Sequence, residues 1–203
     1  MASERDNQRV TSPATMSRLA GLFRASLQKH PILTNTAVYF TFYSAAETSQ
    51  QTYNKYFTAE KPDYDIATGA RIACVGSSIY APSLYYWYRF LDRKFVGTAV
   101  KTIGKKVVCE QFFMTPILLA VFYGLNAILE QKEDLFKEFR EKYLISLAAN
   151  QVFWIPAQTV NFTFIPSHLR VVYVASASFI WINILCFIKR RKVSDGGEKV
   201  EKK

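Results

Sequence analysis

The sequence predicts an all-α fold: an integral membrane helical bundle of about four transmembrane helices, with a membrane-embedded Pro-containing helix and an interfacial amphipathic helix. Half of the 203 residues are hydrophobic, yet the charged residues crowd into a few segments and leave long stretches nearly free of charge. The stretches lack the polar face that the helices of a soluble bundle should show. A membrane bundle therefore fits the sequence better than a soluble one.

The apolar stretches approach the roughly 20 residues that a helix needs to cross a bilayer. The last region, from Ile145 to Ile188, is interrupted by Pro156, Pro166 and Arg170. We expect one full crossing there, from Ser167 onward, because a second would spoil the alternation of charge described below. The expected crossings run from Ile32 to Gln50, from Ile66 to Tyr88, from Val107 to Leu129 and from Ser167 to Ile188.

The stretch from Ile145 to Ile165 is then expected to be embedded in the membrane or buried against the bundle. Pro156 within this stretch and Pro166 just after it leave backbone carbonyls without helical partners, which a membrane tolerates only where protein or water satisfies them. The preceding segment, Gln131 to Tyr143, alternates charges with Leu135, Phe136 and Phe139. This pattern suits an amphipathic helix at the membrane interface, and equally a solvated connecting helix.

Positive charge supports this topology. Five basic residues precede the first crossing, six lie between the second and third, and seven follow the last, whereas the other two connections are poorer or offset by acids. Such alternation is predicted by the positive-inside rule when both chain ends lie on one side. The chain divides into a basic N-terminal segment (1–30), a multispanning membrane domain (31–188) and a basic C-terminal tail (189–203).

Of the charged side chains within the apolar segments, Arg71 and Glu110 are the obvious candidates for a role in the protein interior. A charge near the bilayer centre costs about 2.5 to 3.5 kcal/mol and usually faces the protein interior with a partner. Arg71 and Glu110 are therefore expected either to pair, directly or across a wet cavity, or to lie near helix ends and reach the headgroups. The residues expected to form a pore or polar network are Arg71, Glu110, Gln111, Gln158, Asn161 and Arg170. The neutral ones among them suit a hydrophilic path or hydrogen bonds between helices.

Small residues recur at every fourth position of the second segment. This spacing places them on one helix face, where they let another helix backbone approach closely. The stripe consists of Gly69, Ala73, Ser77 and Ala81.

The sequence shows no catalytic or metal motif, and we expect neither an enzyme nor a cofactor. No Gly-rich phosphate loop and no triad-like set is present. The three cysteines are odd in number and far apart, and the two histidines have no ligand-like neighbours. The cysteines are expected to pack as small hydrophobes. These residues are Cys74, Cys109, Cys186, His30 and His168.

Three stretches resemble the Mpv-seventeen / peroxisomal-membrane-protein-twenty-two family. The first is A-P-x-x-Y-Y-W-Y-x-x-L-D-R, from Ala81 to Arg93; the second holds Glu110-Gln111 and Pro116; the third is W-I-P-A-Q-T-V-N-F-x-F-I-P-x-x-x-R, from Trp154 to Arg170. The resemblance covers roughly Thr34 to Arg191. The motif positions are Pro82, Trp87, Tyr88, Asp92, Arg93, Trp154, Pro156, Phe162 and Pro166.

This chain departs from the family pattern at a few positions. Ala81 replaces the usual Gly, Tyr85 the usual His and Glu110 the usual Asp, and Pro156 sits one position late. A role of the family His is therefore not carried over to Tyr85. The closest resemblance is to the Mpv-seventeen-like protein two branch.

The resemblance implies a multispanning protein of the mitochondrial inner membrane or, alternatively, the peroxisomal membrane, and not an enzyme. It implies channel-like passage of small solutes that supports mitochondrial homeostasis, or, for the branch named above, a membrane-bound assembly factor for the mitochondrial ribosome and translation. The expected partners are the lipid bilayer, further copies of this chain as a homo-oligomer and the mitochondrial ribosome, with no direct DNA binding.

The amino terminus is compatible with mitochondrial targeting. Residues 14–29 are rich in Ser and Arg and contain no acid. Leu19, Leu22, Phe23 and Leu27 are spaced to share one face of a helix. Glu4 and Asp6 argue against a cleavable presequence.

Overall fold

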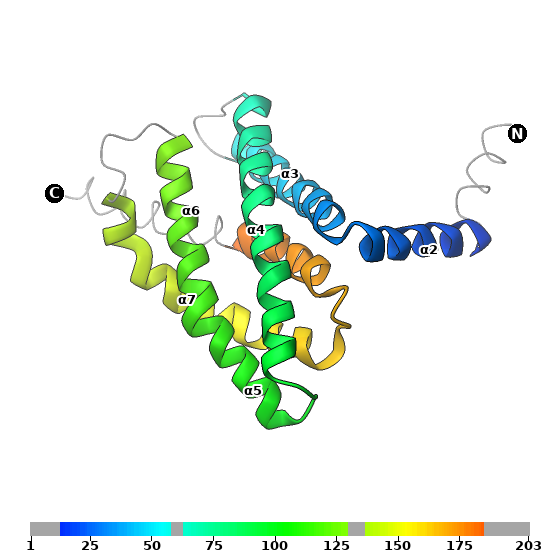
Figure 1. The fold of residues 1–203 in the computed structure, drawn as a ribbon. Coiled ribbons are helices and arrows are strands. Elements are labelled where there is room, and N and C mark those ends of the chain that lie inside the picture. Colours follow the sequence, from blue (N-terminus) through cyan, green and yellow to red (C-terminus); the bar gives the residue numbers. More distant parts are fainter. Residues whose placement is uncertain (1–12, 58–62, 130–136, 185–203) are drawn as a thin grey trace, which may run out of the picture.

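The structure is a computed structural model that describes residues 13–57, 63–129 and 137–184 (Figure 1). Every regular element in these ranges is a helix, which confirms the predicted all-α class. The elements are α2 (Pro13–Lys29), α3 (Pro31–Phe57), α4 (Ile66–Lys94), α5 (Val100–Cys109), the π-helix η1 (Glu110–Met114), α6 (Thr115–Leu129), α7 (Lys137–Phe164) and the helical residues 170–184. Across the described ranges, no helix combines the length and the apolarity that crossing a membrane requires.

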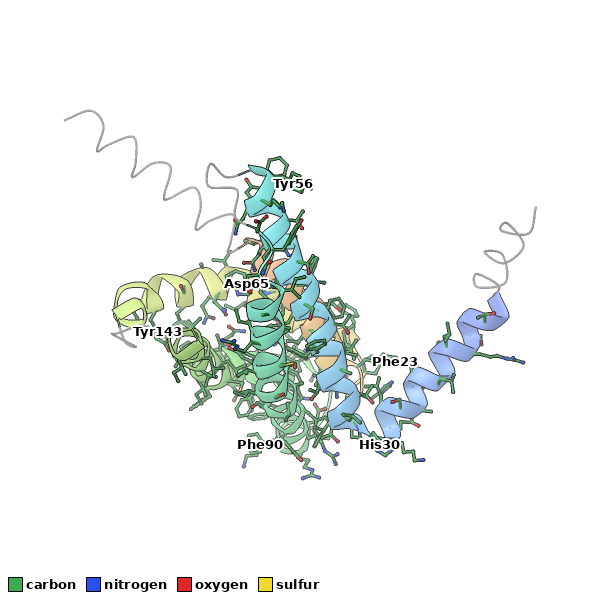
Figure 2. The ribbon with its side chains drawn as sticks, turned by 90° about the horizontal axis from the view of Figure 1, so that it is seen from above. Phe23, His30, Tyr56, Asp65, Phe90 and Tyr143 are labelled. Carbon is green, nitrogen blue, oxygen red and sulfur yellow. The ribbon has the colours of Figure 1, made fainter. Side chains whose placement is uncertain are left out.

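The first helix of the described residues, α2, extends away from the rest of the bundle (Figure 1). It ends just before Pro31, because a residue that precedes proline is disfavoured in the helical conformation. Of the face expected from the sequence, Leu27 is buried, whereas Leu19, Leu22 and Phe23 are exposed. Figure 2 shows Phe23 on this projecting helix, away from the core.

Helices α3 and α4 form an antiparallel pair (Figure 1). Both run past their predicted ends, α3 from Gln50 to Phe57 and α4 from Tyr88 to Lys94. The side chain of Gln51 joins the end of one helix to the start of the other. Its amide nitrogen donates to the carbonyl of Asp65 and its amide oxygen accepts from the Asp65 N–H, both at 2.9 Å.

The small-residue stripe of α4 is buried, and at Gly69 it faces α3. Gly69, Ala73, Ser77 and Ala81 all lie inside, Ala81 with no exposed surface. A Cβ atom at Gly69 would lie only 2.9 Å from Cγ of Glu47 on α3. The absence of a side chain at Gly69 thus lets α3 and α4 approach closely at this position.

A turn at residues 95–99 leads from α4 into one long helical rod. Gly97 has φ 102°, a backbone conformation that suits glycine. The rod of α5, η1 and α6 begins at Val100, earlier than the predicted Val107. The wide π turn immediately precedes Pro116, whose ring would otherwise clash with the carbonyl four residues back. The Thr115 N–H accordingly bonds the carbonyl of Glu110, five residues back.

The second half of the chain differs from the sequence prediction. Part of the predicted interfacial helix, residues 131–136, lies outside the described residues; the remainder is continuous with the predicted embedded helix as α7. Pro156 lies inside α7 on an exposed face and does not end it. The helix ends at Phe164, near Pro166, and the chain turns into the helical residues 170–184. The predicted last crossing extends to Ile188, beyond the described range.

Large side chains from α3, α4, α7 and residues 170–184 form the core. Tyr39, Leu84, Leu91 and Phe162 are almost completely buried. Trp181 stacks on Phe153 at 5.3 Å between ring centroids and thereby ties the last helical segment to α7. This core holds the functional side chains described next.

Candidate functional site

Polar side chains gather in the interior of the bundle. Burying a polar group is costly unless it is hydrogen-bonded, so such groups need an explanation. The buried polar and charged residues of the described chain are Asn35, Ser77, Lys106, Glu110, Gln111, Asn150, Gln158, Asn161, Arg170 and Ser178.

The outside of the bundle carries many large apolar side chains. A water-soluble protein exposes single hydrophobes, but extended apolar surface marks contact with a protein or a membrane. Exposed apolar residues on α3 to α7 and the last segment include Leu33, Phe40, Tyr86, Phe90, Val108, Phe112, Phe113, Ile117, Ile128, Leu144, Val152, Ile155, Phe164 and Ile180.

The π turn presents its polar residues to the interior. Glu110, Gln111 and Met114 are buried, whereas Phe112 and Phe113 between them are exposed. A π turn widens the helix by one residue, so it changes which side chains face inward. The same turn that accommodates Pro116 therefore sets the position of the Glu110 carboxyl group.

The Glu110 carboxyl group is held by neutral donors from two other helices. From α4, Trp87 Nε1 donates to its Oε2, and the Tyr88 hydroxyl lies 3.5 Å from its Oε1. From α7, Gln158 Nε2 donates to the same Oε1 at 3.2 Å and to the Tyr88 hydroxyl at 2.9 Å. Asn161 Nδ2 then donates to Gln158 Oε1 at 2.9 Å. These five residues, called the Glu110 network below, connect α4, η1 and α7.

A second carboxylate, Asp92 near the end of α4, is held by cations. Its Oδ1 accepts from Lys106 Nζ at 2.7 Å and from Arg170 Nη1 at 2.5 Å. Its Oδ2 accepts from the Ser167 hydroxyl at 2.7 Å. Arg170 also donates to the carbonyl of Ile165 at 3.3 Å. These contacts, the Asp92 cluster, join α4, α5 and the turn that follows α7.

The Asp92 cluster perturbs the titration of its carboxyl group. Partial burial by itself would raise the pKa of Asp92, because the charged form loses solvation. Hydrogen bonds from Lys106, Ser167 and Arg170, together with the Arg170 charge, outweigh this and hold the pKa below its ordinary value. Asp92 is thus kept as the anion that its two buried cations require.

Phe162 lies between the two groups of polar residues. Its ring packs edge-to-face on Tyr88, with 5.7 Å between centroids. The guanidinium of Arg170 lies 5.1 Å from the ring centroid and Lys106 Nζ lies 5.9 Å from it. An aromatic face attracts cations, so Phe162 contacts both the Glu110 network and the Asp92 cluster.

Several buried amide side chains have at least one polar atom without a hydrogen-bond partner in the described part of the chain. Both polar atoms of the Gln111 side chain, and the side-chain oxygens of Asn150, Asn161 and Asn35, make no hydrogen bond within the described part of the chain. Each such group carries the cost of lost solvation unless another polar molecule contacts it. Gln111, Asn150 and Asn161 belong to η1 and α7, the same elements that hold Glu110 and Gln158.

The structure brings together three of the six residues expected in the polar network, Glu110, Gln158 and Asn161. Arg170 lies in the neighbouring Asp92 cluster, and Gln111 is buried beside Glu110 in the chain. Arg71 is exposed, and no ion pair joins it to Glu110, although both residues are described. The direct pair is ruled out because Arg71 lies about 24 Å along α4 from Trp87, which contacts Glu110.

Other site residues were not expected in these roles. Lys106 was counted among the loop cations, yet it is 5% exposed and bonds Asp92. Asn35 and Asn150 were not singled out. Of the motif positions, Trp87, Tyr88, Asp92 and Phe162 belong to the site. A signal for Asp92 was present, because it is the one acidic residue between Ile66 and Cys109.

The remaining motif positions lie around the site rather than in it. Trp154 is buried in the core, Arg93 and Pro166 are exposed and Pro82 is half-buried in α4. Among the residues that the structure describes, no three His, Cys, Asp or Glu side chains could hold a metal ion together. What the arrangement offers is an acidic group among neutral hydrogen-bond donors and unpartnered amides.

Comparisons with known proteins give consistent matches. The model of the Mpv17 / PMP22 family matches residues 127–186. The Mpv17-like protein of Xenopus laevis is 31% identical over 168 residues, which cover 83% of this chain and 81% of that protein. Protein SYM1 of Kluyveromyces lactis is 27% identical over 190 residues, covering 91% and 95%. The PXMP2/4 family protein 2 of Dictyostelium discoideum is 28% identical over 170 residues, covering 82% and 88%. No solved structure matches significantly.

Proposed function

The chain belongs to the Mpv17 / PMP22 family, as its motifs predicted, and on this basis we propose that it is a multispanning membrane protein that passes small hydrophilic solutes. The proposed location is the mitochondrial inner membrane, with the peroxisomal membrane as the alternative. The proposed crossings are those expected from the sequence, so the second ends at Tyr88. The branch within the family stays a prediction.

The distribution of side chains supports a bilayer as the surrounding solvent. The bundle exposes large apolar residues such as Phe112, Val152 and Phe164, and it buries Glu110, Gln158 and Asn161. In a membrane, apolar side chains face lipid, and ionisable ones face the protein interior or a water-filled cavity. Polar groups inside and apolar groups outside are the arrangement that this environment favours.

The observation that carries solute passage is the Glu110 network with the unpartnered amides beside it. A channel needs polar groups that converge, and groups from α4 and α7 converge on Glu110 of η1. Gln111 and Asn161 have hydrogen-bonding capacity that the described protein does not use. A hydrophilic solute that contacts these amides would satisfy them. Because one small bundle leaves little lumen, we propose that homo-oligomers form the conducting unit.

The test is the conductance of the purified full chain in planar bilayers. Glu110→Gln removes the charge but keeps a polar side chain of similar size, so we expect altered conductance or ion selectivity. Arg71→Gln is the matched control, because Arg71 is exposed on α4 and is not part of the network. We expect that variant to conduct as the wild type does.

A folded wild type that passes no current and no small solutes would exclude the proposed passage. Equal changes in both variants would mean that any charge on the bundle alters conductance, and would remove Glu110 from the path. The alternative proposal, an assembly factor for the mitochondrial ribosome, rests on the eighteen basic residues of the three positive segments; the last of these segments, the tail 189–203, lies outside the described residues.

A further inference from the structure

The helix ends on either side of the turn between α4 and α5 carry positive charge that nearby acids do not neutralise. Five cations between positions 89 and 105 are exposed, and none of them forms an ion pair with a described residue. The one acid in this stretch, Asp92, is already bonded to Lys106 and Arg170. These exposed cations are Arg89, Arg93, Lys94, Lys101 and Lys105.

Exposed apolar side chains stand among these cations. Val96 in the turn is 81% exposed and Val100 at the start of α5 is 86% exposed. Phe90, 52% exposed, lies one helical turn before Lys94, and Figure 2 shows it at the edge of the bundle. The backbone at Gly97 makes the turn that presents Val96 and Val100 close to the cations on either side of it.

We propose that residues 89–105, which comprise the turn at 95–99 and the helix ends on either side of it, bind anionic phospholipid headgroups. Lys94, Lys101 and Lys105 contact the phosphates, and Val96 and Val100 enter the boundary between headgroups and acyl chains. Basic residues at a membrane surface attract anionic lipid, and apolar side chains beside them add buried area. The inference rests on the proposed function in so far as that function places the turn at a membrane surface.

The mixture of side chains favours lipid over nucleic acid. RNA phosphates would engage the cations, but exposed aliphatic side chains would gain nothing from a phosphate backbone. The outer face of the helical rod that follows the turn is also apolar, because Val108, Phe112 and Phe113 are exposed there. Cations at the turn followed by apolar side chains along the helix match the order of headgroups and acyl chains across a leaflet.

The experiment measures thermal unfolding of the full chain in neutral detergent while phosphatidylglycerol is added, with phosphatidylcholine as the reference lipid. The test variant is Lys94→Gln/Lys101→Gln/Lys105→Gln. The matched control, Arg18→Gln/Arg24→Gln/Arg71→Gln, removes three exposed cations elsewhere. Each cation near an anionic surface contributes about a factor of five. We therefore expect the apparent affinity for phosphatidylglycerol to fall on the order of 100-fold in the test variant and to stay nearly unchanged in the control.

A second variant, Val96→Ser/Val100→Ser, separates lipid from other anions. It should weaken phosphatidylglycerol binding severalfold and leave all five cations in place. Equal stabilisation by inorganic phosphate, or binding of an RNA oligonucleotide that depends on the lysines and ignores the valines, would overturn the lipid assignment. If both triple variants lost affinity for phosphatidylglycerol equally, the net charge of the protein would explain the binding, and residues 89–105 would not form a lipid site.

Conductance separates this inference from the proposed function. In bilayers of phosphatidylcholine the lysine variant should conduct as the wild type does, because its changes lie outside the Glu110 network. A silent wild type that still binds phosphatidylglycerol through these lysines would reject solute passage and keep the lipid site. A wild type that conducts but does not distinguish phosphatidylglycerol from phosphatidylcholine would reject the lipid site and keep solute passage.

Discussion

The Glu110 network and the Asp92 cluster each hold one carboxyl group, but they hold it differently. Glu110 accepts hydrogen bonds from the neutral groups of Trp87, Tyr88 and Gln158. Asp92 accepts from two buried cations, Lys106 and Arg170. The comparison shows that a buried ion pair joins the helices at one end of the site. The other carboxyl group, that of Glu110, has no paired cation within the described part of the chain.

The largest expected effect is on stability, from Asp92→Asn. This change leaves Lys106 and Arg170 buried without an anion, and breaking such a pair costs on the order of 3 kcal/mol. Thermal unfolding in detergent measures the loss. The exposed neighbour Arg93 provides the control, because Arg93→Gln should change stability by less than about 0.5 kcal/mol. Equal effects from the two substitutions would show that the cluster does not join the helices.

The contribution of Asp92 should depend on pH in a defined direction. Because the folded-state pKa of Asp92 is lowered, its stabilising effect is fully present above the ordinary carboxyl value of about 4 and is lost as pH falls through the lowered pKa. The difference in melting temperature between wild type and Asp92→Asn should be constant from about pH 5 to 7 and shrink only below about pH 4. A difference that already shrinks near pH 6 would contradict the assigned partners.

Phe162→Leu should have an intermediate effect, of about 2 kcal/mol. It removes the edge-to-face contact with Tyr88 and the ring face that Lys106 and Arg170 approach. A double-mutant cycle with Asp92→Asn measures whether the ring and the ion pair are coupled. Strictly additive effects would mean that Phe162 fills space between the two regions without linking them.

Glu110→Gln should destabilise the protein less, by about 1 kcal/mol. The substituted amide keeps one acceptor, and no buried cation loses its partner, so the cost is near that of one neutral hydrogen bond. The change should appear in conductance rather than in unfolding. A stability loss as large as that of Asp92→Asn would show that Glu110 serves the fold in the same way as Asp92.

Arg71→Gln should have the smallest effect, below about 0.5 kcal/mol, because Arg71 is exposed. Unfolding in detergent measures it alongside Glu110→Gln. A loss that matches Glu110→Gln, and that disappears when both changes are combined, would restore the coupling that the sequence suggested between these two residues.

Much of the candidate site was predictable as a set of residues, but not as a set of contacts. Glu110, Gln158 and Asn161 stood out because polar side chains in apolar segments are costly. Arg71 stood out for the same reason and is exposed on α4. Lys106 appeared to be one more loop cation, since burial of a lysine depends on a partner that is distant in the sequence. The π turn was not predicted, although Pro116 supplies its local cause.

The sequence alone determined the helical class, the family and the main helical segments, because these follow from apolar runs, proline positions and short motifs. The small-residue face of α4 was also readable, since a spacing of four places residues on one side of a helix. Only the tertiary structure decided that Asp92 pairs with Lys106 and Arg170, that Glu110 accepts hydrogen bonds from neutral donors, and that α7 continues through Pro156. These outcomes depend on which helix faces meet, and pairing between residues as many as 78 positions apart leaves no local pattern in the chain.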